Sequence, residues 1–308
     1  MKNNYSVIES EIVKDFVVAE IETIIEQGGP ETYQYTYTDS LFKQLKTKLQ
    51  NGELPADVAQ NLLGKCTFLN TNNSVMGHIR QKPYGYAGDF MIIERIYQNQ
   101  PDTSTDFYKW DEYSLSHLAA QAVRNRKSYF KSVIQNRIQK SNNNLSLLDV
   151  ASGPARDLKE LFDQTADNSL KVTCVEMDSR AIEFAKNLNV SHLYHIEFIN
   201  QNIFKFRTEA KYDVVWSAGL FDYFDDRGFV LVLKKLMDFA TEKGEIIIGN
   251  FNDENPSRDF MEMVGDWILN HRSEEQLINL AIQAGADPAK IWVGQEPEGI
   301  NLFLHIWK

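Results

Sequence analysis

The chain has 308 residues, about twice the length of a typical domain, so we expect two domains or one domain with a large extension. Hydrophobic residues make up 43% of the sequence and charged residues 24%, which is typical of a globular protein with a buried core. The 43 acidic residues outnumber the 32 basic residues, for a net charge of -11. This balance argues against a nucleic-acid partner, because contacts to phosphates need a basic face.

The two cysteines, Cys66 and Cys174, are too few for a disulfide framework or a cysteine-rich metal site, which favours a cytoplasmic location. The N-terminal segment is too charged for a signal peptide, and no apolar run approaches 18 residues, so we expect no membrane span. No histidine spacing is typical of metal ligands, and we predict no metal. The histidines concerned are His192, His195, His271 and His305.

Helical periodicity dominates the first 140 residues, where apolar residues recur at steps of three and four. We expect helices over about 7–24, 39–51, 56–69, 90–97 and 105–140, with a polar loop at 70–74. The polar run 140–144 is prone to turns, and we place a domain boundary there. The prediction is a helical N-terminal domain over 1–140 that caps or binds substrate, followed by a second domain over 141–308.

After this boundary, short apolar runs alternate with helical patterns. Continuous apolar strands separated by helices are typical of a parallel sheet covered on both faces. The last two runs are too close for a helix between them, so they should form an antiparallel hairpin at the sheet edge. We therefore predict an α/β fold with a seven-stranded sheet. Its strands are expected at about 145–150, 171–176, 194–199, 212–217, 244–250, 290–294 and 301–307.

The turn after the first predicted strand reads Asp149-Val-Ala-Ser-Gly-Pro-Ala-Arg156 and leads into a helix. A small-residue turn at this place lets the backbone approach a ligand, and the helix N-terminus offers free N–H groups. Only Gly153 is glycine, whereas a dinucleotide fold would have three glycines to make room for a pyrophosphate. The turn therefore favours a ligand without phosphates, and a tight turn with no ligand is the alternative.

The following strand ends carry further polar groups. Glu176 ends the second strand, where an acid can bind a ribose diol. Asn202 and Ile203 follow the third strand, where an amide can read an adenine edge and an apolar side chain can pack on the ring. The fourth strand leads into 217–224, and ligands collect at such carboxyl ends in open α/β sheets.

Because of these residues, the segment 140–308 resembles the class I S-adenosylmethionine-dependent methyltransferases. The resemblance implies S-adenosylmethionine as cofactor and S-adenosylhomocysteine as product. It assigns the first turn to the aminoacyl part, the acid after strand two to the ribose, the loop after strand three to the adenine, and 217–220 to the floor near the methyl group. Two departures are Ala151, where the family has glycine, and Asn202, where it has an acid. The implied cofactor residues are Asp149, Ala151, Ser152, Gly153, Ala155, Arg156, Glu176, Met177, Asn202, Ile203, Ser217, Ala218 and Gly219.

Two N-terminal stretches narrow the resemblance to one subgroup of these methyltransferases. The segment 80–90, with Tyr84 and Tyr86 between two glycines and a proline, is either a lid over the cleft or a turn whose tyrosines pack in the core. The stretch 121–126 places Arg124 and Arg126 on a helix, as a solvated face or as anion-binding groups. With the first turn, these stretches resemble the bacterial enzymes that make 3-hydroxypalmitic acid methyl ester. That subgroup implies carboxyl O-methylation of a hydroxy fatty acid or a similar acid.

A carboxylate acceptor is ionised at neutral pH and needs a clamp rather than a general base. An alcohol, phenol or amine would need a base or proton relay. Candidate clamps and acceptor-binding groups are Arg80, Lys82, Arg124, Arg126, Tyr84 and Tyr86. Candidate groups for proton transfer are His117, Asp222, Tyr223 and Asp89. Packing, helix capping or a solvated surface are the alternative roles of these side chains.

Three functions remain open at this point. The first is a methyltransferase acting on a small organic acid, and the second is N- or O-methylation of a natural product or peptide. The third is a module that binds the cofactor without catalysis, which the suitable groups after four strands argue against. An apolar tunnel under the N-terminal helices would favour an acyl acceptor, whereas a polar, open cleft would favour the second function. The sequence leaves a monomer or a homodimer open.

Overall fold

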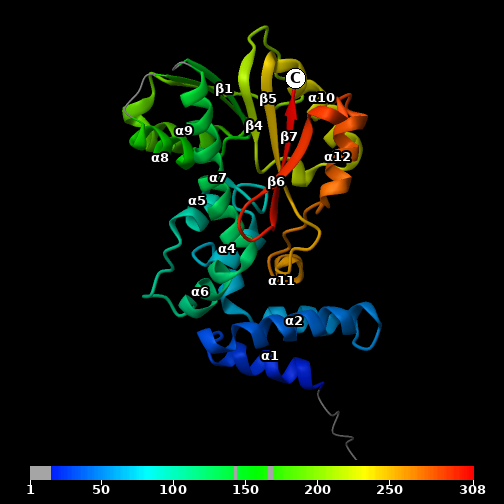
Figure 1. Ribbon diagram of the computed structural model, residues 1–308. Helices are drawn as coiled ribbons and strands as arrows, with labels where there is room; N and C mark the ends of the chain where they lie inside the picture. Colours follow the sequence, from blue (N-terminus) through cyan, green and yellow to red (C-terminus); the bar gives the residue numbers. More distant parts are fainter. Residues whose placement is uncertain (1–14, 142–143, 166–168) are drawn as a thin grey trace, which may run out of the picture.

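The computed structural model describes residues 15–141, 144–165 and 169–308. The part of the first predicted helix before Asp15, and residues 142–143 of the predicted boundary, lie outside the described residues. The described chain forms a lobe that contains the sheet and a lobe of helices, with α1 and α2 farthest from the sheet (Figure 1). The helical elements are α1 (Phe16–Glu26), α2 (Tyr35–Gln50), α3 (Ala56–Gly64), α4 (Val75–Gln81), α5 (Phe90–Gln98), α6 (Tyr108–Ser116) and α7 (Leu118–Lys140).

The structure corrects the N-terminal prediction at three places. The predicted helix over 56–69 ends at Gly64, a residue with poor helix propensity, and a short 3-10 turn over Thr67–Asn70 follows. Helix α4 was not predicted; it begins after Ser74, whose side chain accepts a hydrogen bond from the Gly77 amide at 2.9 Å. The single helix predicted over 105–140 was wrong, because His117 has an extended backbone (ψ 145°) that separates α6 from α7.

The predicted seven-stranded sheet is confirmed. Its order is β3-β2-β1-β4-β5-β7-β6, and β7 alone runs antiparallel to both of its neighbours. The chain order reverses between β1 and β4, the switch point at which open α/β sheets bind ligands. The strands are β1 (Leu145–Val150), β2 (Leu170–Glu176), β3 (Ile196–Asn200), β4 (Tyr212–Ser217), β5 (Ala240–Phe251), β6 (Ile291–Gln295) and β7 (Asn301–Trp307).

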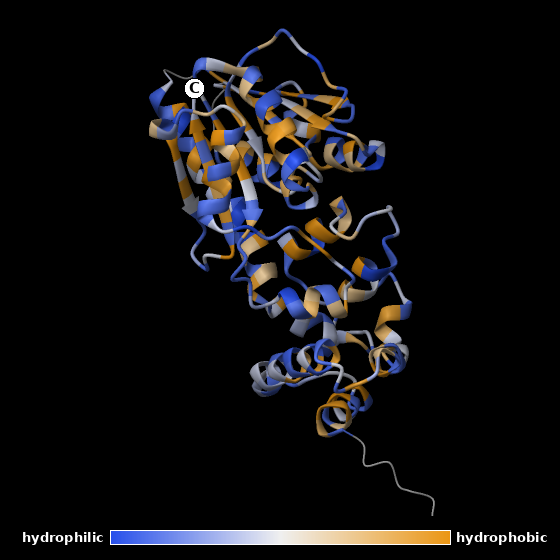
Figure 2. Cartoon of the chain, turned by 90° about the vertical axis from the view of Figure 1, so that its right-hand side faces the viewer, coloured by the Kyte–Doolittle hydropathy of each residue, from blue (hydrophilic) through white to orange (hydrophobic). Residues whose placement is uncertain are grey.

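Helices cover both faces of the sheet (Figure 1). One face packs against α7, α8 (Arg156–Gln164) and α9 (Ser179–Leu188), and the other against α10 (Asp226–Phe239) and α12 (Glu274–Gln283). Apolar residues run along the strands and the facing sides of these helices (Figure 2). Because both faces are covered, the strands need continuous apolar sequences, which is the pattern that predicted them.

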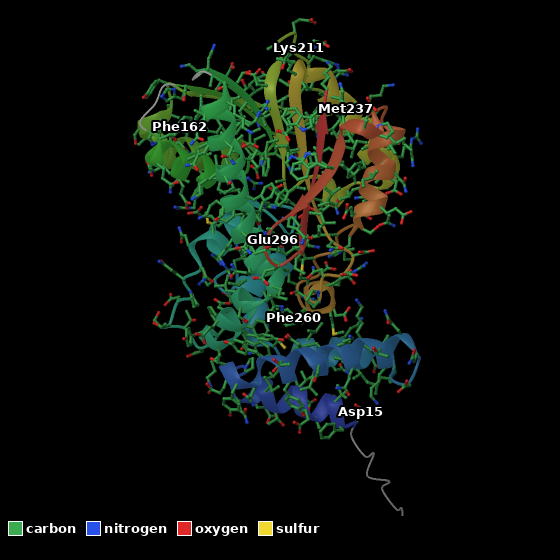
Figure 3. The ribbon with its side chains drawn as sticks, viewed as in Figure 1. Asp15, Phe162, Lys211, Met237, Phe260 and Glu296 are labelled. Carbon is green, nitrogen blue, oxygen red and sulfur yellow. The ribbon has the colours of Figure 1, made fainter. Side chains whose placement is uncertain are left out.

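The packing between the two lobes crosses the boundary predicted at residue 140. Phe130 and Ile134 of α7 belong to the core on one sheet face, although they precede that boundary. In the other direction, the segment 251–269, which contains α11 (Arg258–Met263), packs into the core of the helical lobe. Figure 3 labels Phe260 where α11 lies against α2, and there Lys46 pairs with Asp259 at 2.8 Å.

None of the helices formed by the described residues combines the length and the apolarity needed to cross a bilayer.

Candidate functional site

A cavity of about 360 Å³ lies where the two lobes meet, at the carboxyl ends of β1, β2, β4 and β5. The loop after β3 completes its strand side. Its other walls come from α5, α7 and the segment 251–269. The cavity therefore occupies the edge of the sheet where the sequence predicted a ligand, and the helical lobe closes it.

The turn after β1 has an unusual backbone. Ala151, Gly153 and Ala155 all adopt positive φ, at 57°, 54° and 51°. This conformation costs an alanine roughly 1 kcal/mol that glycine avoids, so the turn is held in place by its surroundings. A Cβ built at Gly153 would meet nothing within 4 Å, which leaves open space beside the backbone at the cavity wall.

Glu176 closes the turn from the end of β2. Its carboxylate accepts hydrogen bonds from the Gly153 amide at 3.1 Å and from the Asp178 amide at 2.9 Å. Burial raises the pKa of Glu176, and these two amides oppose the rise. The acid is therefore fixed in place at the cavity wall, beside Met177, a residue that is 62% exposed.

The loop after β3 brings Asn202 and Ile203 to the cavity, as the resemblance implied. The Asn202 side chain accepts a hydrogen bond from the Phe204 amide at 2.9 Å, and its amide nitrogen lies 3.6 Å from the Met177 sulfur. Ile203 is buried and contributes an apolar surface to the same wall.

The floor after β4 is formed by Ala218 and Gly219. Ser217 lies beneath this floor: it is fully buried, does not line the cavity, and donates a hydrogen bond to the Val150 carbonyl at 3.0 Å. Arg126 of α7 reaches across from the helical lobe and donates a hydrogen bond to the Ala218 carbonyl. One predicted anion-binding residue thus lies directly at the cavity.

Carboxylates surround Arg126 at the cavity. Among the described residues that line the cavity, Arg126 is the only basic side chain, whereas the acids are Asp149, Asp157, Glu176 and Asp222. Burial raises the pKa of Asp149 well above its ordinary value, and the nearby carboxylates of Asp157 and Glu176 raise it further, while Arg126 opposes them. A cavity of this kind favours a ligand that carries positive charge.

Asp222 is buried directly after β4. Its carboxylate accepts a hydrogen bond from the Phe251 amide at 2.6 Å, and burial raises the pKa of Asp222 to about 6. The neighbouring Tyr223 hydroxyl accepts a hydrogen bond from the Trp267 indole at 3.0 Å, and burial raises the pKa of Tyr223. At neutral pH, Asp222 can accept a proton, while Tyr223 remains a neutral hydroxyl.

The segment 82–89 lies over part of the cavity. Tyr86 and Gly88 line it, which places this segment at the site. Tyr84 does not line it: its ring packs against Phe90 with centroids 4.7 Å apart and lies 4.7 Å below the Arg180 guanidinium. The two tyrosines therefore have different surroundings, one toward the cavity and one between the segment and α9.

Four residues predicted for acceptor binding do not line this cavity, and three of them contact other protein groups with their charged ends. Arg80 donates to the carbonyls of Met263 and Val264, and Lys82 pairs with Asp266 at 2.6 Å. Arg124 donates to the Leu115 carbonyl at 3.0 Å and to the Gln121 side chain at 2.8 Å. His117 is buried inside the helical lobe, beside a second, smaller cavity.

Three other candidate residues also have structural partners. Arg156, predicted for the cofactor, forms a two-pronged ion pair with the buried Glu94 of α5. Ala155 is buried at the N-terminus of α8 and does not line the cavity. Asp89 caps α5 and pairs with His78 at 2.8 Å, so its carboxylate is unavailable as a base.

Sequence reasoning missed some of the lining. Asp157 directly follows the turn 149–156, and its position in the first turn of α8, four residues after Gly153, was the signal that a second acid faces the cavity. Trp267 and Tyr97 also line the cavity, and neither was selected as a site residue. Nothing local in the sequence distinguishes these aromatics from other buried rings. Within the described part of the chain, no group of three His, Cys, Asp or Glu side chains is arranged to hold a metal ion.

Known proteins share this architecture. Residues 141–291 match the family model of a methyltransferase domain. A crystal structure of a "possible exported protein" from Bordetella parapertussis is 15% identical, with a TM-score of 0.65 over 96% of this chain and 97% of that one. Magnesium protoporphyrin IX methyltransferase from Synechocystis PCC 6803, solved with S-adenosylmethionine, is 13% identical, with a TM-score of 0.51 over 76% of this chain and 97% of that one.

At such identities the structural likeness shows the fold alone, and none of the curated proteins matches the chain in sequence. The Bordetella structure extends the likeness to nearly the whole chain, including the helical lobe. The family match covers the turn after β1, the acid of β2 and the other three acids that line the cavity, a group that suits a cationic cofactor. The chain thus contains a class I methyltransferase domain and is an S-adenosylmethionine-dependent methyltransferase.

Proposed function

We propose that the cavity residues from the strand ends hold the cofactor, and that the acceptor binds on the side of the helical lobe. The observation that carries the cofactor placement is the group of four carboxylates around the cavity, because S-adenosylmethionine carries a sulfonium and an ammonium group. When bound, the cofactor supplies an electrophilic methyl group. The residues proposed to hold it are Asp149, Ala151, Ser152, Gly153, Asp157, Glu176, Met177, Asn202, Ile203, Ala218 and Gly219.

For the acceptor, we propose a small organic acid with an apolar body, methylated on its carboxylate oxygen as in a hydroxy fatty acid or a similar acid. Arg126 supports a carboxylate, since its guanidinium lines the cavity and can attract an anion beside its bonds to the Ala218 carbonyl and the Tyr97 hydroxyl. The aromatic and aliphatic walls from α5, α7 and 251–269 support the apolar body. A carboxylate needs no base, so positioning and exclusion of water are the main tasks of the protein.

A second candidate is N- or O-methylation of a natural product or peptide. Asp222 supports it, because a buried carboxylate at the cavity whose pKa lies near 6 can accept a proton from a hydroxyl or an ammonium group at neutral pH. The excess of acids over Arg126 also suits an acceptor without negative charge. A small-molecule acceptor and a cytoplasmic location remain predictions under both candidates.

The two candidates differ in the chemistry of the product. We would incubate the protein with methyl-labelled S-adenosylmethionine and panels of organic acids, amines and phenols, and then treat the products with mild alkali. A methyl ester releases labelled methanol, whereas an N-methyl group or a methyl ether is stable. Base-stable label without any base-labile label would refute carboxyl methylation.

Cofactor binding is tested separately by calorimetric titration of S-adenosylmethionine and S-adenosylhomocysteine. Gly153→Arg is the negative variant, because an arginine there would occupy the open space beside the backbone and strain its positive φ. Retained affinity in the folded variant would refute the placement of the cofactor. Ser217→Ala is the matched control, since this residue lies beneath the floor and does not line the cavity.

A further inference from the structure

A second cavity of about 30 Å³ lies in the helical lobe next to the first. The two cavities share Val123, Phe251 and Trp267 as wall residues, so the cavities adjoin at these side chains. The remaining walls of the second cavity come from α4, α5, α6, α7 and α11. It therefore extends the acceptor side of the site away from the strand ends.

The chemistry of this second cavity is almost entirely apolar. Its two polar wall residues are Ser114 and His117. The Ser114 hydroxyl is already bound to the Trp110 carbonyl at 2.6 Å. An ordered water needs two to four polar partners, so the cavity is a poor site for water and a good site for an apolar group.

His117 is the one polar group there that lacks a satisfied partner. Its side chain is 7% exposed, its Nε2 has no hydrogen-bond partner, and the nearest carboxylate oxygen, of Asp39, lies 3.5 Å away. Burial lowers the pKa of His117 to about 4, so the imidazole is neutral at physiological pH. A neutral imidazole adds no charge to repel an apolar ligand from this space.

We propose that the second cavity binds the apolar end of the methyl acceptor. This inference rests on the proposed function, in which the acceptor occupies the helical side of the first cavity. The small volume of the cavity, about 30 Å³, limits the group to a terminal methyl or ethyl rather than a long chain. Ala119 and Ala120 of α7 leave this space open.

Methionine side chains in the walls of the two cavities can report ligand binding by NMR. Met76 and Met261 line the second cavity, Met177 lines the first, and Met237 of α10 lines neither. In protein labelled with 13C at the methionine methyl groups, we expect S-adenosylhomocysteine to shift the Met177 signal. Hexanoate added to that complex should then shift the signals of Met76 and Met261 and leave Met237 unchanged.

A chain-length series makes the test quantitative. From acetate upward, each methylene that becomes buried should tighten binding about fourfold, and the gain should stop once the cavity is filled. Ala120→Leu should remove the response of Met76 and Met261 and weaken hexanoate binding at least about tenfold, with unchanged affinity for S-adenosylhomocysteine. Ala119→Val, a smaller change in the same wall, serves if Ala120→Leu does not fold.

The outcomes separate this inference from the proposed function. If 1-hexanol or hexylamine shifts Met76 and Met261 while no acid is methylated, carboxyl methylation fails and the second cavity still binds the apolar end. If hexanoate, 1-hexanol and hexylamine all leave Met76 and Met261 unchanged at saturating concentration, the inference is overturned, whatever the methylated atom. If affinity does not depend on chain length, the inference is likewise refuted.

Discussion

Gly88 offers the sharpest test of how the segment 82–89 is fitted to the cavity. A Cβ built at this position would lie well inside the van der Waals distance of the Tyr223 hydroxyl oxygen and 2.8 Å from Cζ2 of Trp267. These two side chains also hydrogen-bond to each other at 3.0 Å. Gly88→Ala must therefore move an aromatic pair or lift the segment from the site.

The expected cost follows from these contacts. Forcing one extra methyl group into a packed site costs about 1–3 kcal/mol, and loss of the hydrogen bond between Tyr223 and Trp267 adds about 1 kcal/mol. We expect Gly88→Ala to lower the free energy of unfolding in urea by about 2–4 kcal/mol and to reduce turnover, because Gly88 and Tyr223 both line the cavity.

Two comparisons show whether the contact is the cause. Gly64→Ala at the end of α3 is the matched control, because its Cβ would meet nothing within 4 Å and alanine is the better helix former. Tyr223→Phe removes the oxygen closest to the new methyl group, so Gly88→Ala should cost less in that background than in the wild type. Equal stability of the Gly88→Ala and Gly64→Ala variants, or strict additivity with Tyr223→Phe, would refute the reasoning.

Four further predictions concern the proposed cofactor wall and Asp222. Ala151→Gly should raise the free energy of unfolding by about 1 kcal/mol, measured by denaturation, because glycine adopts a φ of 57° without strain. Glu176→Gln should weaken S-adenosylmethionine binding about tenfold or more in calorimetry, since a charged acceptor of hydrogen bonds is lost; unchanged affinity would contradict the ribose role. If Asp222 is the base, kcat/KM should fall as the pH drops below about 6, and Asp222→Asn should abolish turnover of hydroxyl or amine acceptors. Because the folded pKa of Asp222 lies above the ordinary value of 3.8, its ionisation should also lower stability as the pH rises from about 4 to about 6, and Asp222→Asn should remove this slope from the denaturation curves.

The sheet could be predicted because its sequence signal is local and redundant. Strands covered on both faces must be apolar along their whole length, and the observed bounds of β1, β4 and β7 agree with those expected. The cavity wall at the strand ends was predictable for a related reason: parallel strands end at one edge, so residues that follow separate strands meet there. Positions in the chain alone therefore brought Gly153, Glu176 and Asn202 together.

The helical side of the site could not be predicted in the same way. A helical pattern shows which residues are apolar, but it does not show which partner a cation will find across the fold. Arg80 and Lys82 contact groups on the segment 263–266, far away in the sequence, whereas Arg126 reaches the cavity from the same helix as Arg124. The break between α6 and α7 at His117 could not be predicted either, since the apolar spacing continues through it.

The interwoven cores explain why the helical lobe and the sheet act as one unit. Helix α7 contributes Val123 to the core of the helical lobe and Phe130 to the core of the sheet, and Arg126 lies between them at the cavity. Phe251 ends β5 and packs into the helical lobe while lining both cavities. A substitution that shifts either core will therefore move the cavity walls of the helical lobe relative to the cavity walls at the strand ends. Because methyl transfer depends on alignment within a fraction of an ångström, acceptor selectivity should respond to packing changes in the helical lobe more strongly than cofactor affinity does.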